Sequence, residues 1–243
     1  MYRKTKLALV ISSVALLLAC GGGGGGGGST SNVDPQGIWY GPASTGYDIK
    51  AVVLETGETW GFYTSGSTIY GALYGSTAVN GSSVSITGTD FNFLTNSTAP
   101  GNLRGTVTAK SSMSLSGTNS TVPLTYDSSY DIPASASAAI GTYSFFGRSS
   151  GYILIPGSIT IDGAGRFILN QTNCVTTGSI VPRAGGKNIY NMTLTAVGAG
   201  CAAGQSTLSG VTYLNTSITP HQFYALALKS DKSDGLIVVG TKQ

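Results

Sequence analysis

Charged side chains are scarce in this chain of 243 residues, of which Asp, Glu, Lys and Arg make up 9%, against about 25% in an ordinary soluble domain. Three of the 13 basic residues, Arg3, Lys4 and Lys6, stand at the very start, which leaves ten to match the ten acidic residues. The remainder of the chain therefore has a net charge near zero. We expect no nucleic-acid partner, because binding to phosphates needs a basic surface.

The side chains that usually carry catalysis or hold metals are also few. The only histidine is His221, and the only glutamates, Glu55 and Glu58, flank a predicted tight turn. A closed zinc site needs four Cys or His ligands at suitable spacing, which this set does not supply. We therefore predict no catalytic residues, no metal and no cofactor. Two aspartate pairs are interpreted first as turn formers and second as weak calcium ligands: Asp127 with Asp131, and Asp231 with Asp234.

One motif keeps an enzymatic alternative open. Residues 147–151 read Gly-Arg-Ser-Ser-Gly, the G-x-S-x-G pattern of serine hydrolases. That mechanism needs the serine on a tight turn between a strand and a helix, whereas residues 152–155 continue as a strand pattern. A hydrolase would have to pair Ser149 with His221, and a hairpin loop is the preferred interpretation.

The first twenty residues have the layout of an export signal. A basic start is followed by an almost wholly apolar stretch, residues 7–18, which as a helix would span about 18 Å and is too short to cross a bilayer. The exit, Leu17-Leu18-Ala19-Cys20, resembles the lipobox of bacterial lipoproteins. The resemblance implies cleavage after residue 19 and lipid attachment to Cys20. An ordinary signal peptide with a chance cysteine is the alternative.

A glycine run follows the predicted lipid site. Residues 21–28 are all glycine, and we expect residues 20–34 to be a flexible tether with a reach of about 20 Å. Polyglycine after a lipidated cysteine resembles the surface-displayed lipoproteins of the transferrin-binding and factor H-binding type. Gly21 in place of Asp is similar to lipoproteins sorted to the cell outer membrane. These resemblances imply a membrane-anchored, surface-exposed protein with a protein or glycan ligand.

Beyond the tether, short runs rich in β-formers alternate with Gly, Ser, Asn and Asp, and no convincing amphipathic helix occurs. This pattern predicts an all-β protein of two modules, residues 35–132 and 139–243, joined by an Ala/Ser-rich linker, 133–138. Module 1 has nine candidate strands, at 38–43, 47–55, 59–64, 68–74, 83–87, 90–94, 102–109, 112–116 and 122–126. Module 2 has eight, at 141–146, 152–162, 166–171, 176–182, 189–197, 207–214, 222–228 and 236–240.

We predict that module 2 is an eight-stranded antiparallel up-and-down barrel, because closure leaves no open strand edge. Cys174 and Cys201 remain once Cys20 is assigned to lipid, and an exported pair predicts a disulfide; two free buried thiols are the alternative.

Four aromatic residues are candidates for ligand binding: Trp39, Tyr40, Trp60 and Tyr63. Packing inside a barrel is the alternative for all of them. Gly37 and Trp39 also resemble the first-strand motif of lipocalins, in which the tryptophan plugs one barrel end. The leading hypothesis is a non-enzymatic, lipid-anchored binding protein; a periplasm-facing structural, assembly or inhibitor lipoprotein is the second.

Overall fold

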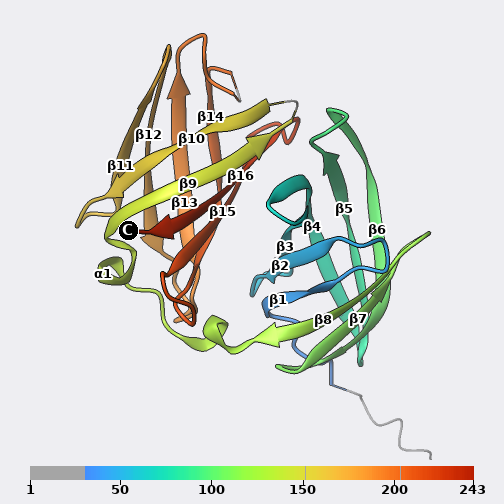
Figure 1. Cartoon of the computed structure of the whole chain (residues 1–243). Coiled ribbons are helices and arrows are strands. Elements are labelled where there is room, and N and C mark those ends of the chain that lie inside the picture. Colours follow the sequence, from blue (N-terminus) through green and yellow to red (C-terminus); the bar gives the residue numbers. More distant parts are fainter. Residues whose placement is uncertain (1–30, 151, 203) are drawn as a thin grey trace, which may run out of the picture. The chain divides into compact units, whose positions relative to one another are not determined.

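The computed structural model describes residues 31–150, 152–202 and 204–243, and Ser31–Gln243 form one compact unit. The predicted signal peptide, Cys20 and the glycine run lie outside the described residues. The described chain is almost entirely β-structure, arranged as two closed antiparallel barrels of eight strands each (Figure 1). None of its helices is both long enough and apolar enough to cross a membrane.

Barrel 1 is an up-and-down ring in which each strand pairs with the next along the chain and the eighth strand pairs with the first, Trp39 lying opposite Tyr126. Its strands are β1 (Gly37–Pro42), β2 (Asp48–Val53), β3 (Glu58–Ser65), β4 (Thr68–Asn80), β5 (Ser83–Asn92), β6 (Ser97–Thr108), β7 (Ser112–Ser116) and β8 (Thr121–Asp127).

Module 1 therefore has eight strands and not the nine expected. The two strands predicted at 83–87 and 90–94 are the single strand β5. Gly88, which falls between the two predicted strands, lies directly opposite Gly75 of β4, and the pairing continues through both glycines. Two glycines at facing positions let the strands approach closely, and the ladder continues through them without a break.

Barrel 2 has all eight predicted strands, and the prediction of an up-and-down barrel is confirmed. Its ring is closed by the first strand, which lies between the second and the last. The strands are β9 (Gly141–Ser149), β10 (Tyr152–Ile161), β11 (Arg166–Gln171), β12 (Cys174–Pro182), β13 (Tyr190–Val197), β14 (Ser206–Asn215), β15 (Gln222–Lys229) and β16 (Gly235–Lys242).

The predicted disulfide is confirmed. Cys174 at the start of β12 is bonded to Cys201 in the loop between β13 and β14, with a sequence separation of 27 residues. Both cysteines are buried, together with Ala196. The bond therefore ties this loop to one end of barrel 2.

Two short helices lie between the barrels along the chain, η1 (Ser128–Asp131) and α1 (Ala136–Ala139). The second one overlaps the predicted linker, for which no helix was expected. The side chain of Ser135 caps α1 by accepting a hydrogen bond from the Ala138 amide at 3.2 Å. A cap of this kind stabilises a single helical turn that composition alone does not indicate.

Strand β15 is buried on both faces, with the burial of residues 223–228 unbroken. Phe223, Ala225 and Ala227 belong to the core inside barrel 2. The alternate residues Tyr224, Leu226 and Leu228 join a core that also includes residues from the outer face of barrel 1. A strand covered on both sides has an almost continuous apolar sequence, which explains why β15 and β16 lack the polar alternation of β13.

Candidate functional site

The interiors of the two barrels differ in how completely side chains fill them. A cavity of about 460 Å³ lies inside barrel 1, whereas a space of about 90 Å³ lies inside barrel 2. Ligand cavities typically measure about 300–1,000 Å³, and an eight-stranded barrel is just wide enough for packed side chains or one small ligand. The interior of barrel 1 is therefore the candidate site.

Small residues at inward positions make barrel 1 hollow. Ala51, Gly61, Gly101 and Gly117 all line its cavity. A Cβ added at Gly61 would meet only ordinary contacts, 3.4 Å from the Lys50 carbonyl oxygen and 3.5 Å from the Ala51 Cβ. The equivalent space in barrel 2 is filled by large side chains, among them Phe145, Phe167, Met192, Leu194 and Phe223.

Trp39 closes one end of the barrel 1 cavity. Its side chain is completely buried, its Nε1 donates a hydrogen bond to the Pro35 carbonyl oxygen at 3.1 Å, and its ring packs edge-on against Tyr126 at 5.3 Å between centroids. A Cβ at Gly37 would lie within 2.8 Å of both rings, so this packing depends on the glycine. Gly37 thus makes room for the Trp39 ring, which closes the barrel end where β1 begins.

Polar side chains gather at the opposite end of the cavity. In this up-and-down ring, the ends of β1, β3, β5 and β7 lie at the same rim as the starts of β2, β4, β6 and β8. The lining residues at this rim are Thr45, Tyr47, Tyr63, Asp90, Asn92, Asn102, Thr118 and Ser120. The cavity therefore has an apolar floor and a polar mouth.

Asp90 carries the only charge on the cavity wall among the described residues that line it, since none of them is Lys, Arg or His. The Tyr63 hydroxyl donates a hydrogen bond to Asp90 Oδ1 at 3.1 Å. Burial raises the pKa of the Asp90 carboxyl, although the hydrogen bond from Tyr63 acts in the opposite direction. Burial and the neighbouring Asp90 charge likewise raise the pKa of Tyr63.

The four aromatic candidates from the sequence have four different positions. Trp39 lies at the closed end and Tyr63 near the mouth of the cavity. Tyr40 points outward from β1 and is 45% exposed. Trp60 is 4% exposed and packs against Tyr74 at 4.6 Å between ring centroids, in the core that includes residues of both barrels.

Sequence reasoning missed Asp90, Tyr47 and Asn92. The signal for Asp90 was present, because Asp90 shares the inward face of β5 with Val84 and Ile86. An acidic residue in phase with core positions on a strand indicates a carboxylate directed into the barrel.

The structure separates the two residues of the hydrolase alternative. Ser149 is completely buried at the end of β9, opposite Leu236, and its hydroxyl donates to the Ala202 carbonyl oxygen at 3.3 Å. The His221 carbonyl oxygen instead accepts from the Lys242 amide, at the other end of β16. Leu236, opposite Ser149, and Lys242, bonded to His221, are six residues apart on β16, which corresponds to about 20 Å of strand. Ser149 and His221 therefore do not form a nucleophile–base pair.

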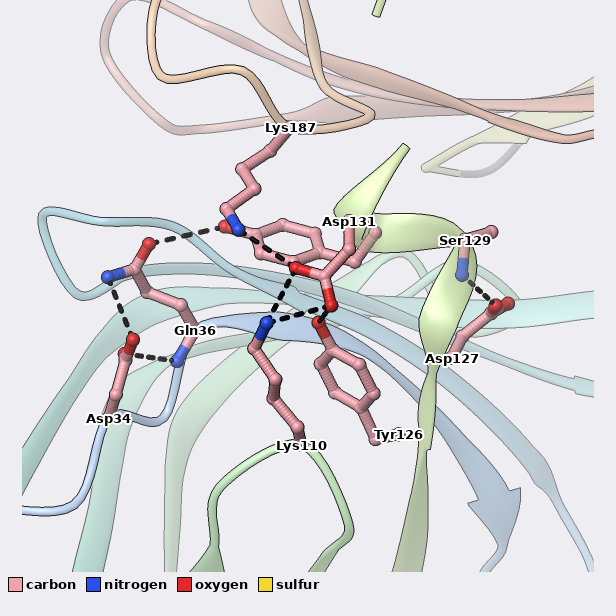
Figure 2. Close-up of polar contacts among 9 residues, drawn as sticks. Asp34, Gln36, Lys110, Tyr126, Asp127, Ser129, Asp131 and Lys187 are labelled. Atoms are coloured by element: carbon pink, nitrogen blue, oxygen red, sulfur yellow. Dashed lines mark hydrogen bonds and ion pairs between the residues drawn. The ribbon is translucent and has the colours of Figure 1, made fainter. Parts of the chain in front are cut away.

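The other acidic residues take part in structural contacts. Asp131 lies between the ammonium groups of Lys110 and Lys187 at 2.9 and 2.8 Å and also accepts from the Tyr126 hydroxyl (Figure 2). Glu55 pairs with Arg183 at 2.7 Å, and Glu58 accepts from Trp60 Nε1 at 3.1 Å.

Two further aspartates of the predicted pairs follow the turn-former interpretation. Asp127 caps η1 by accepting from the Ser129 amide, and Asp231 accepts from the Ser233 amide. Within the described residues, no three His, Cys, Asp or Glu side chains are grouped as a metal site would require.

Comparison of the chain with protein-family models, with curated proteins and with solved structures found no match. The assignment of a function therefore depends on the geometry of barrel 1.

Proposed function

We propose that this protein is a non-enzymatic, lipid-anchored binding protein of the cell envelope, and that barrel 1 holds one small, largely apolar ligand. The observation that carries the proposal is the contrast between the cavities of about 460 Å³ and about 90 Å³ in two barrels of one chain. Barrel 2 has the same number of strands and fills its interior, so a hollow barrel 1 is best explained by an occupant.

A cavity-filling variant tests this proposal. Ala51 lines the cavity, whereas Ala78 on β4 is exposed, so Ala51→Phe and Ala78→Phe add the same ring in different places. We expect the chain from residue 21 onward, which contains every described residue, to bind the neutral probe N-phenyl-1-naphthylamine saturably and at one site. Binding should be lost in Ala51→Phe and kept in Ala78→Phe. Absence of binding, or equal binding by both variants, would contradict the proposal.

The lipid anchor is a separate part of the proposal and has its own test. The lipobox ending at Cys20 and the glycine run support attachment to a membrane by acyl chains, of which two or more make release very slow. We expect radiolabelled palmitate to be incorporated by the natural chain and not by Cys20→Ser. Protease treatment of intact cells then distinguishes the two locations: digestion supports display on the outer surface, and protection supports the periplasm-facing alternative.

A further inference from the structure

We propose that the ligand of barrel 1 is an apolar molecule with a positively charged amine, and that the amine pairs with Asp90 at the cavity mouth. This inference rests on the proposed function and adds the chemical class of the ligand. It depends on three features of the mouth: one carboxylate, no opposing cation, and two tyrosine rings beside it.

The first feature is an incompletely satisfied carboxylate. Asp90 Oδ1 accepts the hydrogen bond from Tyr63, and within the described residues no protein group donates to Oδ2. A carboxylate can accept about four hydrogen bonds, and a half-buried charge with few partners is unfavourable. An ammonium group at Oδ2 would supply both a donor and the opposite charge.

The second feature is the lack of any compensating cation on the cavity wall. Of the described residues that line the cavity, none is Lys, Arg or His. A ligand with a carboxylate or phosphate would bring a second negative charge next to Asp90, which is repulsive at short range. The wall therefore favours a cationic ligand over an anionic one and over a neutral one.

The third feature is aromatic. Tyr47 and Tyr63 both line the cavity, Tyr63 contacts Asp90, and the ring centroids of the two tyrosines are 5.4 Å apart. Ammonium groups are attracted to the faces of aromatic rings within about 6 Å. Two tyrosines and one carboxylate together form a recognised type of environment for an amine, while the floor of the cavity takes an apolar tail.

Competition between three matched amphiphiles tests the inference. Dodecylamine, dodecanol and dodecanoate share one apolar tail and differ in head-group charge. At neutral pH, the two charged compounds are used below their micelle-forming concentrations and dodecanol below its solubility limit. We expect dodecylamine to displace N-phenyl-1-naphthylamine at about one tenth of the dodecanol concentration or less. Dodecanoate should be the weakest competitor.

Two variants assign the preference to Asp90. Asp90→Asn keeps an oxygen that accepts from Tyr63 and removes the charge, so probe binding should remain while the preference for the amine disappears. Asp48→Asn removes an exposed carboxylate on the outer side of the same rim and should leave the preference unchanged.

The outcomes separate this inference from the proposed function. Failure of the probe to bind, or binding insensitive to Ala51→Phe, overturns both. Probe binding that is lost in Ala51→Phe, but with dodecylamine no better than dodecanol, overturns only the amine inference. A preference for the amine that survives Asp90→Asn would also overturn it.

Discussion

Tyr63 on β3 reaches over β4 to donate a hydrogen bond to Asp90 on β5, and it can do so because Gly71 of β4 has no side chain. A Cβ at Gly71 would overlap both the Tyr63 hydroxyl and the Phe91 carbonyl oxygen. The polar mouth of the cavity thus depends on one glycine that does not itself line the cavity.

Gly71→Ala should therefore destabilise barrel 1 by about 1–3 kcal/mol, the usual effect of overpacking. Gly61→Ala is the matched control, because a Cβ there meets only ordinary contacts at 3.4 and 3.5 Å. Urea unfolding measures both. Equal free energies of unfolding for the two variants would show that Gly71 is not needed for the position of Tyr63.

Trp60 should contribute to stability and not to ligand binding, because it packs in the core that includes residues of both barrels. We expect Trp60→Ala to lower the free energy of unfolding by about 3–5 kcal/mol and to leave the affinity for the naphthylamine probe unchanged. The exposed Tyr40 is the control, and Tyr40→Ala should change stability by less than about 0.5 kcal/mol. Loss of probe binding in folded Trp60→Ala would restore Trp60 as a binding residue.

Asp131 makes the free energy of unfolding depend on pH in the acidic range. The hydrogen bond from Lys187, with further contributions from Lys110 and Tyr126, lowers the pKa of Asp131 to about 2. Because the folded-state pKa lies below the unfolded value of about 3.9, the stabilisation is complete above about pH 4 and is lost as the pH falls toward 2.

Thermal unfolding of the natural chain and of Asp131→Asn between pH 7 and pH 2 measures this contribution. The natural chain should be the more stable of the two near neutral pH, and the difference should shrink between pH 4 and pH 2. Asp90→Asn is the control. Because burial raises the pKa of Asp90, folding favours its protonated form, and the stability difference from the natural chain should change with pH in the opposite direction. A constant difference for Asp131→Asn across this range would contradict the assigned pKa.

Reduction of the Cys174–Cys201 disulfide should destabilise barrel 2. Closing a loop with a separation of 27 residues stabilises a fold by about 3–4 kcal/mol in the chain-entropy model. We expect a reductant to lower the melting temperature of the natural chain and to have no effect on the double variant Cys174→Ser, Cys201→Ser. A melting temperature unaffected by reductant in the natural chain would mean that the bond contributes little.

Much of the fold could be predicted from the sequence, because alternation and turn residues specify strands locally. The exception in strand count, at Gly88, arose because an isolated Gly can interrupt a strand pattern, while its glycine partner, Gly75, lies on another strand. Pairing across strands is a property of the barrel and not of the local sequence.

The candidate site was harder to predict for a related reason. Periodicity indicates which residues face inward, but the cavity depends on the summed volume of Ala51, Gly61, Gly101 and Gly117 on different strands. Alternation also cannot tell whether an outward aromatic such as Trp60 meets a ligand or a second barrel. Lipid attachment at Cys20 stays a prediction from the sequence.

The chain offers a direct test of which barrel binds the ligand, since its three methionines are Met1, Met113 and Met192. Met113 lines the cavity of barrel 1 and Met192 lines that of barrel 2. Carbon-13 labelling of methionine methyl groups therefore gives one NMR reporter inside each barrel. Titration with dodecylamine should shift the Met113 methyl resonance saturably and leave that of Met192 in place. A shift confined to Met192, or no shift of either resonance, would contradict the assignment of barrel 1 as the binding site.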